Sequence, residues 1–349
     1  MFQDIFIIGA SGKVGRTLIK QIFEKGDVDV KLHNTPTRIV GLASSKLVYY
    51  NNKGINREET DSFLEGNIGN SLTHLKQILD LIDKEKNLIF VDVTSLKEEM
   101  VKFQLKIIGE TEHGIVTANK NPLAFCDFKD FENLIKTISR YGYRCSVMAG
   151  AEAVDKIRDL RDLGDLPLSI EGCFSGTLGY ICSELEKGKL FSEIVNKAKD
   201  LGYTEPNVAD DLNGKDVAKK ILILARTAGF DINFEDIQLE PFIPENYLEN
   251  IDNISELNDY FKEKVIQASS KGCVLRYVAR FEGNKIKVGL EEVKKDSPLG
   301  ILNETLNKLV ITTSYGTYTI EAPGAGLEIT AQNIRRDLLH QLDNRVLRK

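Results

Sequence analysis

The segment 203–220, YTEPNVADDLNGKDVAKK, gathers the side chains of this chain that are best suited to chemistry. It holds four carboxylates followed by two lysines: Glu205, Asp210, Asp211 and Asp216, then Lys219 and Lys220. Asn213 and Gly214 predict a turn or N-cap that opens a helix. On that helix Asp216 and Lys220 lie four residues apart and share a face. Such a cluster is typical of a site that binds a small zwitterion; the alternative is an exposed ion pair worth a few tenths of a kcal/mol.

A glycine-rich turn near the start of the chain is the second candidate site. Residues 4–8 are apolar, as in a buried strand, and an amphipathic helical pattern follows the turn GASGKVG at 9–15. This order is typical of dinucleotide binding, because the glycines let the backbone approach a pyrophosphate at the helix N-terminus. The predicted cofactor-binding residues are Gly9, Ala10, Gly12, Lys13, Val14 and Gly15. The spacing is G-x-x-G-x-x-G, and a plain flexible turn is the alternative.

The residues after the second predicted strand indicate which dinucleotide is bound. That strand covers 38–43, and Ser44, Ser45 and Lys46 follow it. NAD sites commonly carry an acid at this point to hold the ribose 2′-hydroxyl. Since Ser44 and Lys46 suit a 2′-phosphate better, we predict that NADP is preferred over NAD. The alternative is that Lys46 is only a solvated loop residue.

Two further apolar strands direct polar residues to the same edge of the predicted parallel sheet. The strand 87–93 leads into Thr94 and Ser95, and the strand 114–117 leads toward Asn119 and Lys120. Ligands of open α/β sheets bind at the carboxyl ends of the strands. We therefore predict that all four residues contact the cofactor or its surroundings, although Lys120 could equally be an exposed loop lysine.

The order of elements predicts an α/β protein with two domains. A Rossmann-type dinucleotide-binding domain covers 1–140, and a glycine-rich crossing at 321–326 followed by a helix returns the chain to it through the segment 322–349. Between them, residues 141–321 form an α+β domain, in which two alternating stretches around 282–284 predict a hairpin.

Composition limits the classes of partner. The chain has 349 residues, 42% of them hydrophobic, and a net charge of −6, which argues against nucleic acid and acidic membranes as partners. Five cysteines without CxxC spacing and four scattered histidines predict neither a disulfide framework nor a metal site. Without a signal peptide or a long apolar run, we expect a soluble, cytoplasmic protein.

Together these segments resemble homoserine dehydrogenase over nearly the whole chain. The motifs that carry the resemblance are GASGKVG at 9–15, TANKNP at 117–122, GTLGYI at 176–181, GYTEPNVADDLNGKDVAKK at 202–220 and APGAGLEITA at 322–331. The resemblance implies an NAD(P)-dependent oxidoreductase that interconverts L-homoserine and L-aspartate 4-semialdehyde, on the route to threonine and methionine. It also implies a homodimer, in which the second domain, 141–321, binds the substrate and forms the dimer interface. We expect a short form without the C-terminal regulatory domain that some members carry.

The resemblance assigns a role to each residue of the candidate site. Glu205 and Asp211, with Asp216 nearby, match the acids that hold the substrate ammonium, and Thr177 and Tyr203 match residues that line the substrate pocket. Lys220 matches the lysine proposed to move the hydroxyl proton, with Lys120 as a second lysine. Two lysines in one pocket are chemically reasonable, because burial beside another ammonium favours the neutral base. Lys219, rotated roughly 100° away on the helix, is expected in solvent. Gly324 and Gly326 complete the predicted cofactor site.

Three positions depart from the family pattern. The family commonly has a run E-A-S-V-G-G-G-x-P whose acid and carbonyls hold a monovalent cation, whereas Arg144 replaces the acid here and Glu152 replaces the proline. We therefore predict no bound sodium ion. Gly179 stands where Asn or Ser is usual, and is expected to loosen the pocket rim.

Two other functions are alternatives to this interpretation. An aspartate-semialdehyde dehydrogenase would need a cysteine nucleophile with a base nearby, and neither Cys126 nor Cys145 lies in such a sequence setting. A non-catalytic NAD(P)-binding regulator would not need both lysines and the acids. The sequence leaves feedback inhibition and assemblies beyond a dimer open.

Overall fold

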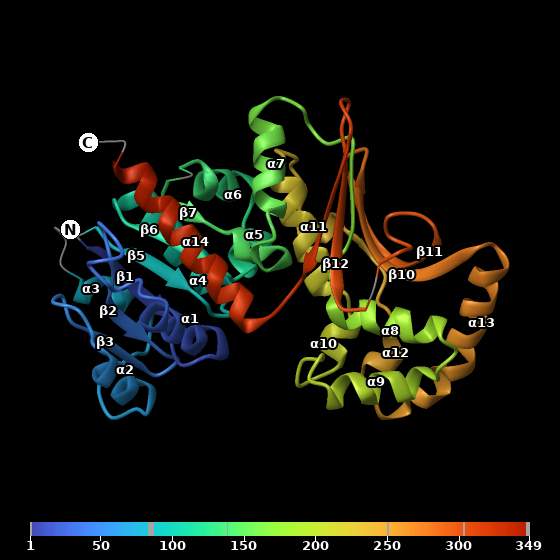
Figure 1. The fold of residues 1–349 in the computed structure, drawn as a ribbon, viewed down its shortest axis with the longest axis horizontal. Coiled ribbons are helices and arrows are strands. Elements are labelled where there is room, and N and C mark those ends of the chain that lie inside the picture. Colours follow the sequence, from blue (N-terminus) through green and yellow to red (C-terminus); the bar gives the residue numbers. More distant parts are fainter. Residues whose placement is uncertain (1, 83–86, 138, 250, 303, 347–349) are drawn as a thin grey trace. The chain divides into compact units, whose positions relative to one another are not determined.

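The chain folds into two compact units in the computed structural model, which describes residues 2–82, 87–137, 139–249, 251–302 and 304–346. The first unit comprises Met1–Gly150 and Gly326–Lys349, and the second comprises Ala151–Ala325 (Figure 1). The predicted domains were 1–140 with 322–349, and 141–321, so the observed division lies ten residues later at one junction and four at the other. The predicted ranges also include residues 347–349, which lie outside the described residues.

The first unit is built on a sheet of seven described strands in the order β4-β3-β2-β1-β5-β6-β7. The five strands from β2 to β7 are parallel, and β3 and β4 extend the sheet antiparallel. Their bounds are β1 Gln3–Ile8, β2 Thr37–Ala43, β3 Leu47–Tyr50, β4 Asn70–Ser71, β5 Ile89–Asp92, β6 Gly114–Thr117 and β7 Tyr141–Gly142. The parallel strands β1, β5 and β6 are buried throughout, as expected of strands covered on both faces.

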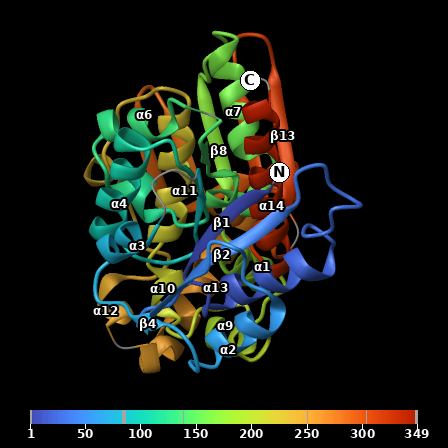
Figure 2. The same cartoon turned by 90° about the vertical axis from the view of Figure 1, so that its left-hand side faces the viewer.

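Helices cover both faces of this sheet, as in Rossmann-type domains. Helices α1 and α14 lie on one face, and α3, α4 and α6 lie on the other (Figures 1 and 2). The helices are α1 Lys13–Glu24, α2 Arg57–Leu64, α3 Lys76–Leu81, α4 Glu98–Glu110, α5 Asn121–Phe125, α6 Phe128–Ile135 and α14 Leu327–Val346, with short 3-10 turns η1 Arg144–Ser146 and η2 Met148–Gly150. Side chains of α14, namely Ala331, Ile334 and Leu338, enter the same core as Ile5, Ile7 and Leu18.

The first unit extends to Gly150 because α14 holds the η1–η2 segment by polar contacts. The buried Arg144 guanidinium pairs with Asp337 of α14, whose other oxygen accepts the Arg144 backbone N–H at 3.1 Å. The Asn333 amide donates to the Ala149 carbonyl at 2.9 Å. Thus the arginine that departs from the family pattern is part of the attachment of the C-terminal helix.

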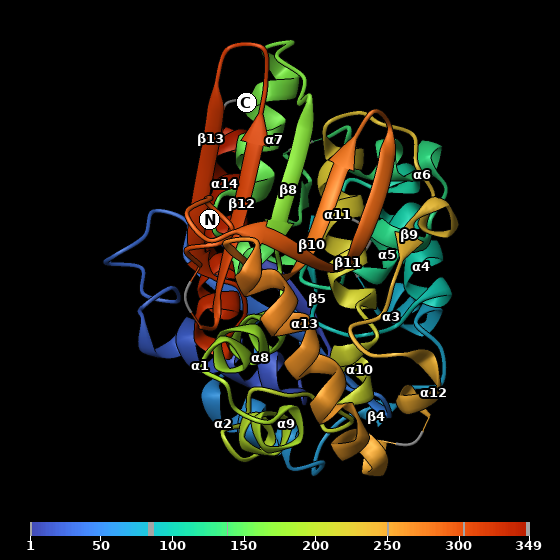
Figure 3. The same ribbon diagram turned by 90° about the vertical axis from the view of Figure 1, so that its right-hand side faces the viewer.

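The second unit contains a sheet of six described strands in the order β13-β12-β8-β10-β11-β9 (Figure 3). All neighbouring pairs are antiparallel except β11 and β9. The bounds are β8 Ser169–Cys173, β9 Gln238–Leu239, β10 Cys273–Glu282, β11 Lys285–Lys294, β12 Leu306–Thr312 and β13 Thr317–Pro323. The predicted hairpin is confirmed as β10 and β11, which turn through Gly283 and Asn284, both with positive φ.

Helix α11 packs on β8, β10 and β11 and is buried along most of its length. Helix α7 packs against α11, and α8 and α13 pack against β10. The helical elements of this unit are α7 Ala153–Asp162, α8 Gly176–Glu186, α9 Phe191–Asp200, α10 Ala209–Leu212, α11 Lys215–Thr227, η3 Phe234–Asp236, α12 Glu245–Leu248, η4 Ile251–Leu257 and α13 Asn258–Ser270. None of the helices in the described ranges is long and apolar enough to cross a membrane.

We expect Asp337→Asn to lower the free energy of unfolding by about 3 kcal/mol, because it removes the charge of the carboxylate that pairs with the buried Arg144 guanidinium. Urea unfolding followed by circular dichroism measures this loss. The matched control is Asp162→Asn, which breaks the exposed pair with Arg161 and should cost less than about 1 kcal/mol. Equal losses in the two variants would contradict a special role for the buried pair.

Candidate functional site

Lys220 is a buried lysine whose ammonium is held at a defined point. Its side chain is 8% exposed, and its Nζ donates to the Phe174 carbonyl at 2.7 Å and pairs with Asp216 Oδ2 at 2.8 Å. Phe174 directly follows β8, and Asp216 lies one turn before Lys220 on α11. The predicted Asp216–Lys220 pair is therefore confirmed, and it differs from the exposed ion pair of the alternative interpretation at its lysine end, which is buried, whereas the Asp216 side chain is 49% exposed.

The start of α11 is fixed by the two residues predicted to open it. Gly214 precedes the helix with φ of 70°, and the Asn213 Oδ1 accepts the Lys215 N–H at 2.8 Å. A Cβ at Gly214 would lie 1.8 Å from the Tyr277 hydroxyl oxygen, so no other residue fits there without rearrangement. This local geometry sets where α11 begins, and the packing of α11 on the sheet then sets the direction of Lys220.

A second group of predicted residues is joined by hydrogen bonds around Asp211. The Thr177 hydroxyl, at the start of α8, lies 3.1 Å from Asp211 Oδ1 and 2.6 Å from the Tyr203 carbonyl. Asp211 Oδ2 accepts the Glu205 N–H at 2.8 Å. The structure thus brings four residues that are up to 34 positions apart in the chain into one cluster: Thr177, Tyr203, Glu205 and Asp211.

The electrostatics of this cluster suit a cationic group. Burial raises the pKa of the Asp211 carboxyl, and the charges of Glu205 and Asp216 raise it further, against the lowering effect of the two hydrogen bonds. Mutual repulsion of this kind shows that the carboxylates of Asp211, Glu205 and Asp216 share one negative region. An ammonium group placed among them would relieve that repulsion.

Lys219 differs from the sequence-based expectation. It was expected in solvent, but its side chain is half-buried. The helix rotates it away from Lys220, as predicted, yet the surface there is partly covered. The position of a residue around a helix gives only the direction of its side chain, whereas the burial of that side chain depends on the elements packed nearby.

The glycine turn between β1 and α1 has the close backbone geometry that was predicted. Gly9 adopts φ of 93°, and a Cβ at Gly15 would lie 2.4 Å from the Gly9 carbonyl oxygen. Within the described part of the chain, α1 has no side-chain cap at Gly12, so its first-turn N–H groups remain suited to a phosphate. Lys13 is exposed and Val14 half-buried, while Ala10 is buried in the core.

The other predicted cofactor residues lie on loops of varied exposure. The Ser44 hydroxyl oxygen accepts the N–H groups of Lys46 and Leu47 at 3.2 and 3.0 Å, which shapes the turn into β3 and leaves Lys46 exposed. Gly324 is buried against the Asn307 side chain, and Gly326 has φ of 142°. Lys120 is half-buried at the N-terminus of α5 in the first unit. Its placement beside Lys220 therefore stays a prediction.

Sequence reasoning missed a buried carboxylate at the carboxyl end of β5. Asp92 is 1% exposed and accepts hydrogen bonds from the Thr94 backbone N–H at 2.9 Å, the Thr94 hydroxyl at 2.7 Å and Gln104 Nε2 at 2.9 Å. The Thr117 hydroxyl lies 3.3 Å from its other oxygen. The one available signal was a charged residue within an otherwise apolar strand. The Phe174 carbonyl was also missed, since a backbone group leaves no trace in the residue pattern.

The cysteine alternative finds no support in the thiols. All five cysteines are free and buried. Burial raises the pKa of the Cys145 thiol well above its ordinary value, whereas a nucleophilic cysteine requires a lowered one. Cys126 is likewise only 6% exposed. Neither is suited to attack a carbonyl carbon.

The first unit is of the Rossmann type and has a glycine turn between β1 and α1. The second unit is α+β and carries a buried lysine and a cluster of carboxylates. Together these features define the class of two-domain proteins with a dinucleotide-binding fold. The family model described as homoserine dehydrogenase matches residues 154–339, more than half of the chain. The chain belongs to the homoserine dehydrogenase family.

Comparisons with individual proteins agree with this assignment. The chain is 34% identical to a bifunctional aspartokinase/homoserine dehydrogenase of Buchnera aphidicola, over 97% of this chain and 42% of the relative. It is also 34% identical to a homoserine dehydrogenase of Paracoccidioides brasiliensis, over 66% of this chain and 68% of the relative. The chain thus spans about two fifths of the bifunctional protein's length. A hyperthermophilic archaeal homoserine dehydrogenase, solved in complex with NADPH, shares the fold with a TM-score of 0.75 at 22% identity, covering 99% of this chain and 98% of that one.

The position of Asp92 predicts an unusual pH dependence of stability. Burial raises the pKa of Asp92 to about 6 from 3.8, so between these values the folded chain binds a proton that the unfolded chain has released. This group therefore makes folding less favourable as pH rises from about 4 to 6. We expect the free energy of unfolding of Asp92→Asn, relative to wild type, to increase by on the order of 3 kcal/mol from pH 4 to pH 7.

Urea unfolding at a series of pH values measures this difference, and other carboxylates cancel because both proteins contain them. Parallel stability curves for wild type and Asp92→Asn would show that Asp92 has no raised pKa in the folded chain.

Proposed function

We propose that this chain interconverts L-homoserine and L-aspartate 4-semialdehyde with a nicotinamide dinucleotide, NADP in preference to NAD. Membership of the homoserine dehydrogenase family supports the reaction. The observation that carries the proposal is Lys220, an ammonium held between the Phe174 carbonyl and Asp216, in a unit where the Asp211 carboxylate also contacts Thr177.

The acids are proposed to bind the ammonium group at the amino-acid end of the substrate. Glu205 is exposed and Asp211 is half-buried, so both carboxylates can meet an ammonium that enters from solvent. Thr177 orients Asp211 by sharing its hydroxyl proton between that carboxylate and the Tyr203 carbonyl. The ammonium would replace repulsion between the acids by attraction, which favours a zwitterion over a neutral alcohol.

Lys220 is the proposed proton donor and acceptor at the reacting oxygen. The bound nicotinamide supplies or accepts the hydride. In the reducing direction, the ammonium of Lys220 donates a proton to the oxygen on which negative charge develops. In the oxidising direction, the neutral amine accepts the hydroxyl proton. The hydrogen bond to Phe174 and the pair with Asp216 hold the Nζ in place for both steps. Lys120 is proposed as the second lysine of the site.

The first unit is the proposed cofactor domain. The glycine turn fits a pyrophosphate, because Gly9 and Gly15 leave no space for a Cβ between backbone segments and α1 begins directly after the turn. Ser44 and the exposed Lys46 are the proposed contacts to a 2′-phosphate. The archaeal structure with a similar fold is in complex with NADPH, which supports the same choice.

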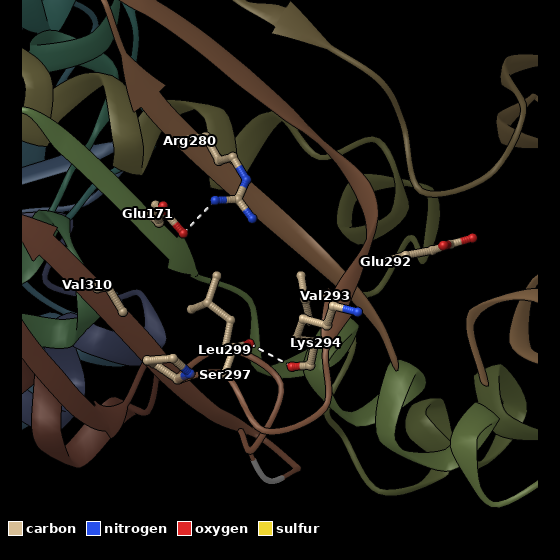
Figure 4. A pocket seen from close by; sticks show the side chains of 9 residues that line it. Glu171, Arg280, Glu292, Val293, Lys294, Ser297, Leu299 and Val310 are labelled. Carbon is tan, nitrogen blue, oxygen red and sulfur yellow. Dashed lines mark hydrogen bonds and ion pairs between the residues drawn. The ribbon is translucent and has the colours of Figure 1, made fainter. Parts of the chain in front are cut away.

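We further propose a cytoplasmic homodimer. Five free cysteines in one chain favour a reducing compartment. For the dimer, the proposed surface is the face of the second sheet opposite α11. There Arg280 pairs with Glu171 at 2.5 Å and with Glu291 at 2.7 Å, beside a cavity of about 430 Å³ that Val293, Leu299 and Val310 help to line (Figure 4). Apolar side chains framed by paired charges are typical of an interface.

Replacing Lys220 tests the proposed reaction. Lys220→Ala should lower kcat for L-homoserine oxidation by at least about 100-fold, because general acid–base catalysis contributes roughly 10²–10⁴-fold. Its affinity for NADP should stay unchanged. The measurement is NADP-dependent absorbance change at alkaline pH, with NAD run in parallel. Lys219→Ala, on the neighbouring position, is the control and should keep most of the activity.

A wild-type protein that binds NADP but turns over neither homoserine nor the semialdehyde would refute the proposed reaction. In that case the family fold would serve cofactor binding without this chemistry.

The proposed dimer surface can be tested without touching the site. Thr319 is exposed on β13 and pairs with Val310 on the same face of the sheet. We expect Thr319→Arg to shift the protein from dimer to monomer in light scattering, because it introduces a bulky charge against the partner's sheet. Ser269→Arg, at an exposed position on α13, should leave the dimer intact. A monomeric wild type, or a dimeric Thr319→Arg, would contradict this surface.

A further inference from the structure

Asp92 presents an arrangement that the proposed mechanism does not use. Its carboxylate is buried at the carboxyl end of β5, in the middle of the parallel sheet. A buried carboxylate is costly unless its oxygens are well hydrogen-bonded, and an apolar residue would serve a purely structural strand better. Its presence at the sheet edge where cofactor residues are predicted therefore needs an explanation.

The donors to Asp92 come from three different elements. Thr94, in the loop after β5, gives its backbone N–H and its hydroxyl to one oxygen. The other oxygen accepts a hydrogen bond from Nε2 of Gln104, which lies on α4. The same oxygen lies 3.3 Å from the Thr117 hydroxyl at the end of β6. Gln104 is itself fixed, because the Tyr141 hydroxyl donates to its Oε1 at 2.5 Å. One carboxylate thus links two neighbouring strand ends and a helix.

These contacts continue outward into the two loops. The Thr117 hydroxyl oxygen accepts the Asn119 N–H at 3.0 Å, and Asn119 Nδ2 reaches the Thr94 hydroxyl oxygen at 3.3 Å and the Leu96 carbonyl at 2.9 Å. Asn121 Nδ2 donates to the Ser95 carbonyl at 2.8 Å. The loops after β5 and β6 are therefore bound to each other, and Asp92 anchors both.

The glycine turn packs directly on this network. A Cβ at Gly9 would lie 3.0 Å from the Val93 carbonyl oxygen and 3.1 Å from the Thr94 methyl group. The rotamer of Thr94, which Asp92 fixes through the hydroxyl, therefore determines the surface on which the turn rests. The loops after β1, β5 and β6 are thus all held, directly or through Thr94, by the buried Asp92 carboxylate.

We propose that Asp92 is a positioning residue for the dinucleotide: its carboxylate sets the loops after β5 and β6, and through Thr94 the glycine turn, in the arrangement that binds the cofactor. This inference rests on the proposed function of the first unit as a cofactor domain. It assigns Asp92 no contact with the cofactor. The residue acts through Thr94 and Asn119.

Asp92→Asn tests the proposal, because the amide keeps the shape but replaces one acceptor oxygen with an N–H₂ that faces two donors. We expect the Kd for NADPH, from a fluorescence titration of the full chain, to rise at least 10-fold. The KM for homoserine, measured at saturating NADP, should change less than twofold. A merely structural role would alter both constants together or neither.

Asp4→Asn is the matched control. Asp4 is also a largely buried carboxylate of the same sheet, but it lies near the amino end of β1 and pairs with Arg38 at 2.6 Å. This variant should lose thermal stability while its Kd for NADPH stays within twofold of wild type. If Asp4→Asn weakens NADPH binding as much as Asp92→Asn does, cofactor affinity reports only general destabilisation and the proposal is overturned.

Thr117→Val gives a second, gentler variant if Asp92→Asn does not fold. It removes one hydroxyl between Asp92 and Asn119 and should raise the Kd for NADPH severalfold. An unchanged Kd in whichever of these variants folds would overturn the positioning role alone. A wild type that binds neither NADPH nor NADH would instead overturn the proposed function, and this inference with it.

Discussion

The buried ammonium of Lys220 constrains much of the second unit. Lys220 can be buried only because a backbone carbonyl and a carboxylate meet its Nζ, so the end of β8 and the first turn of α11 must be held in register. Gly214 and Asn213 fix where α11 begins, and packing of α11 on the sheet fixes its rotation. The buried apolar stripe of the helix and its buried Lys220 are therefore parts of the same structural requirement.

The two units use different kinds of sheet, and each kind supports a candidate site of different chemistry. The parallel sheet brings several loops to one edge, where backbone groups and small polar side chains suit phosphates and riboses. The antiparallel sheet instead supports a buried helix and a carboxylate cluster, which suit a small charged substrate. In each unit a buried charged side chain, Asp92 or Lys220, links elements that are distant in sequence.

Local patterns predicted most of what lies along the chain. The glycine turn, the β10–β11 hairpin and the Asp216–Lys220 pair are set by residues a few positions apart, and each was confirmed. The strands β3 and β4 and the half-burial of Lys219 were not foreseen, since both depend on neighbours from other segments. Arg144 illustrates the limit: its partner Asp337 lies 193 residues away, and no periodicity connects them.

The closure of the first unit by α14 has a consequence for folding on the ribosome. Residues 1–150 are synthesised before α14, so their core lacks Ala331, Ile334 and Leu338 until α14 emerges. The second unit, continuous from Ala151 to Ala325, is complete earlier. The first unit thus completes its core after the second unit, and the apolar face that α14 will cover must be kept from aggregation while residues 151–325 are synthesised.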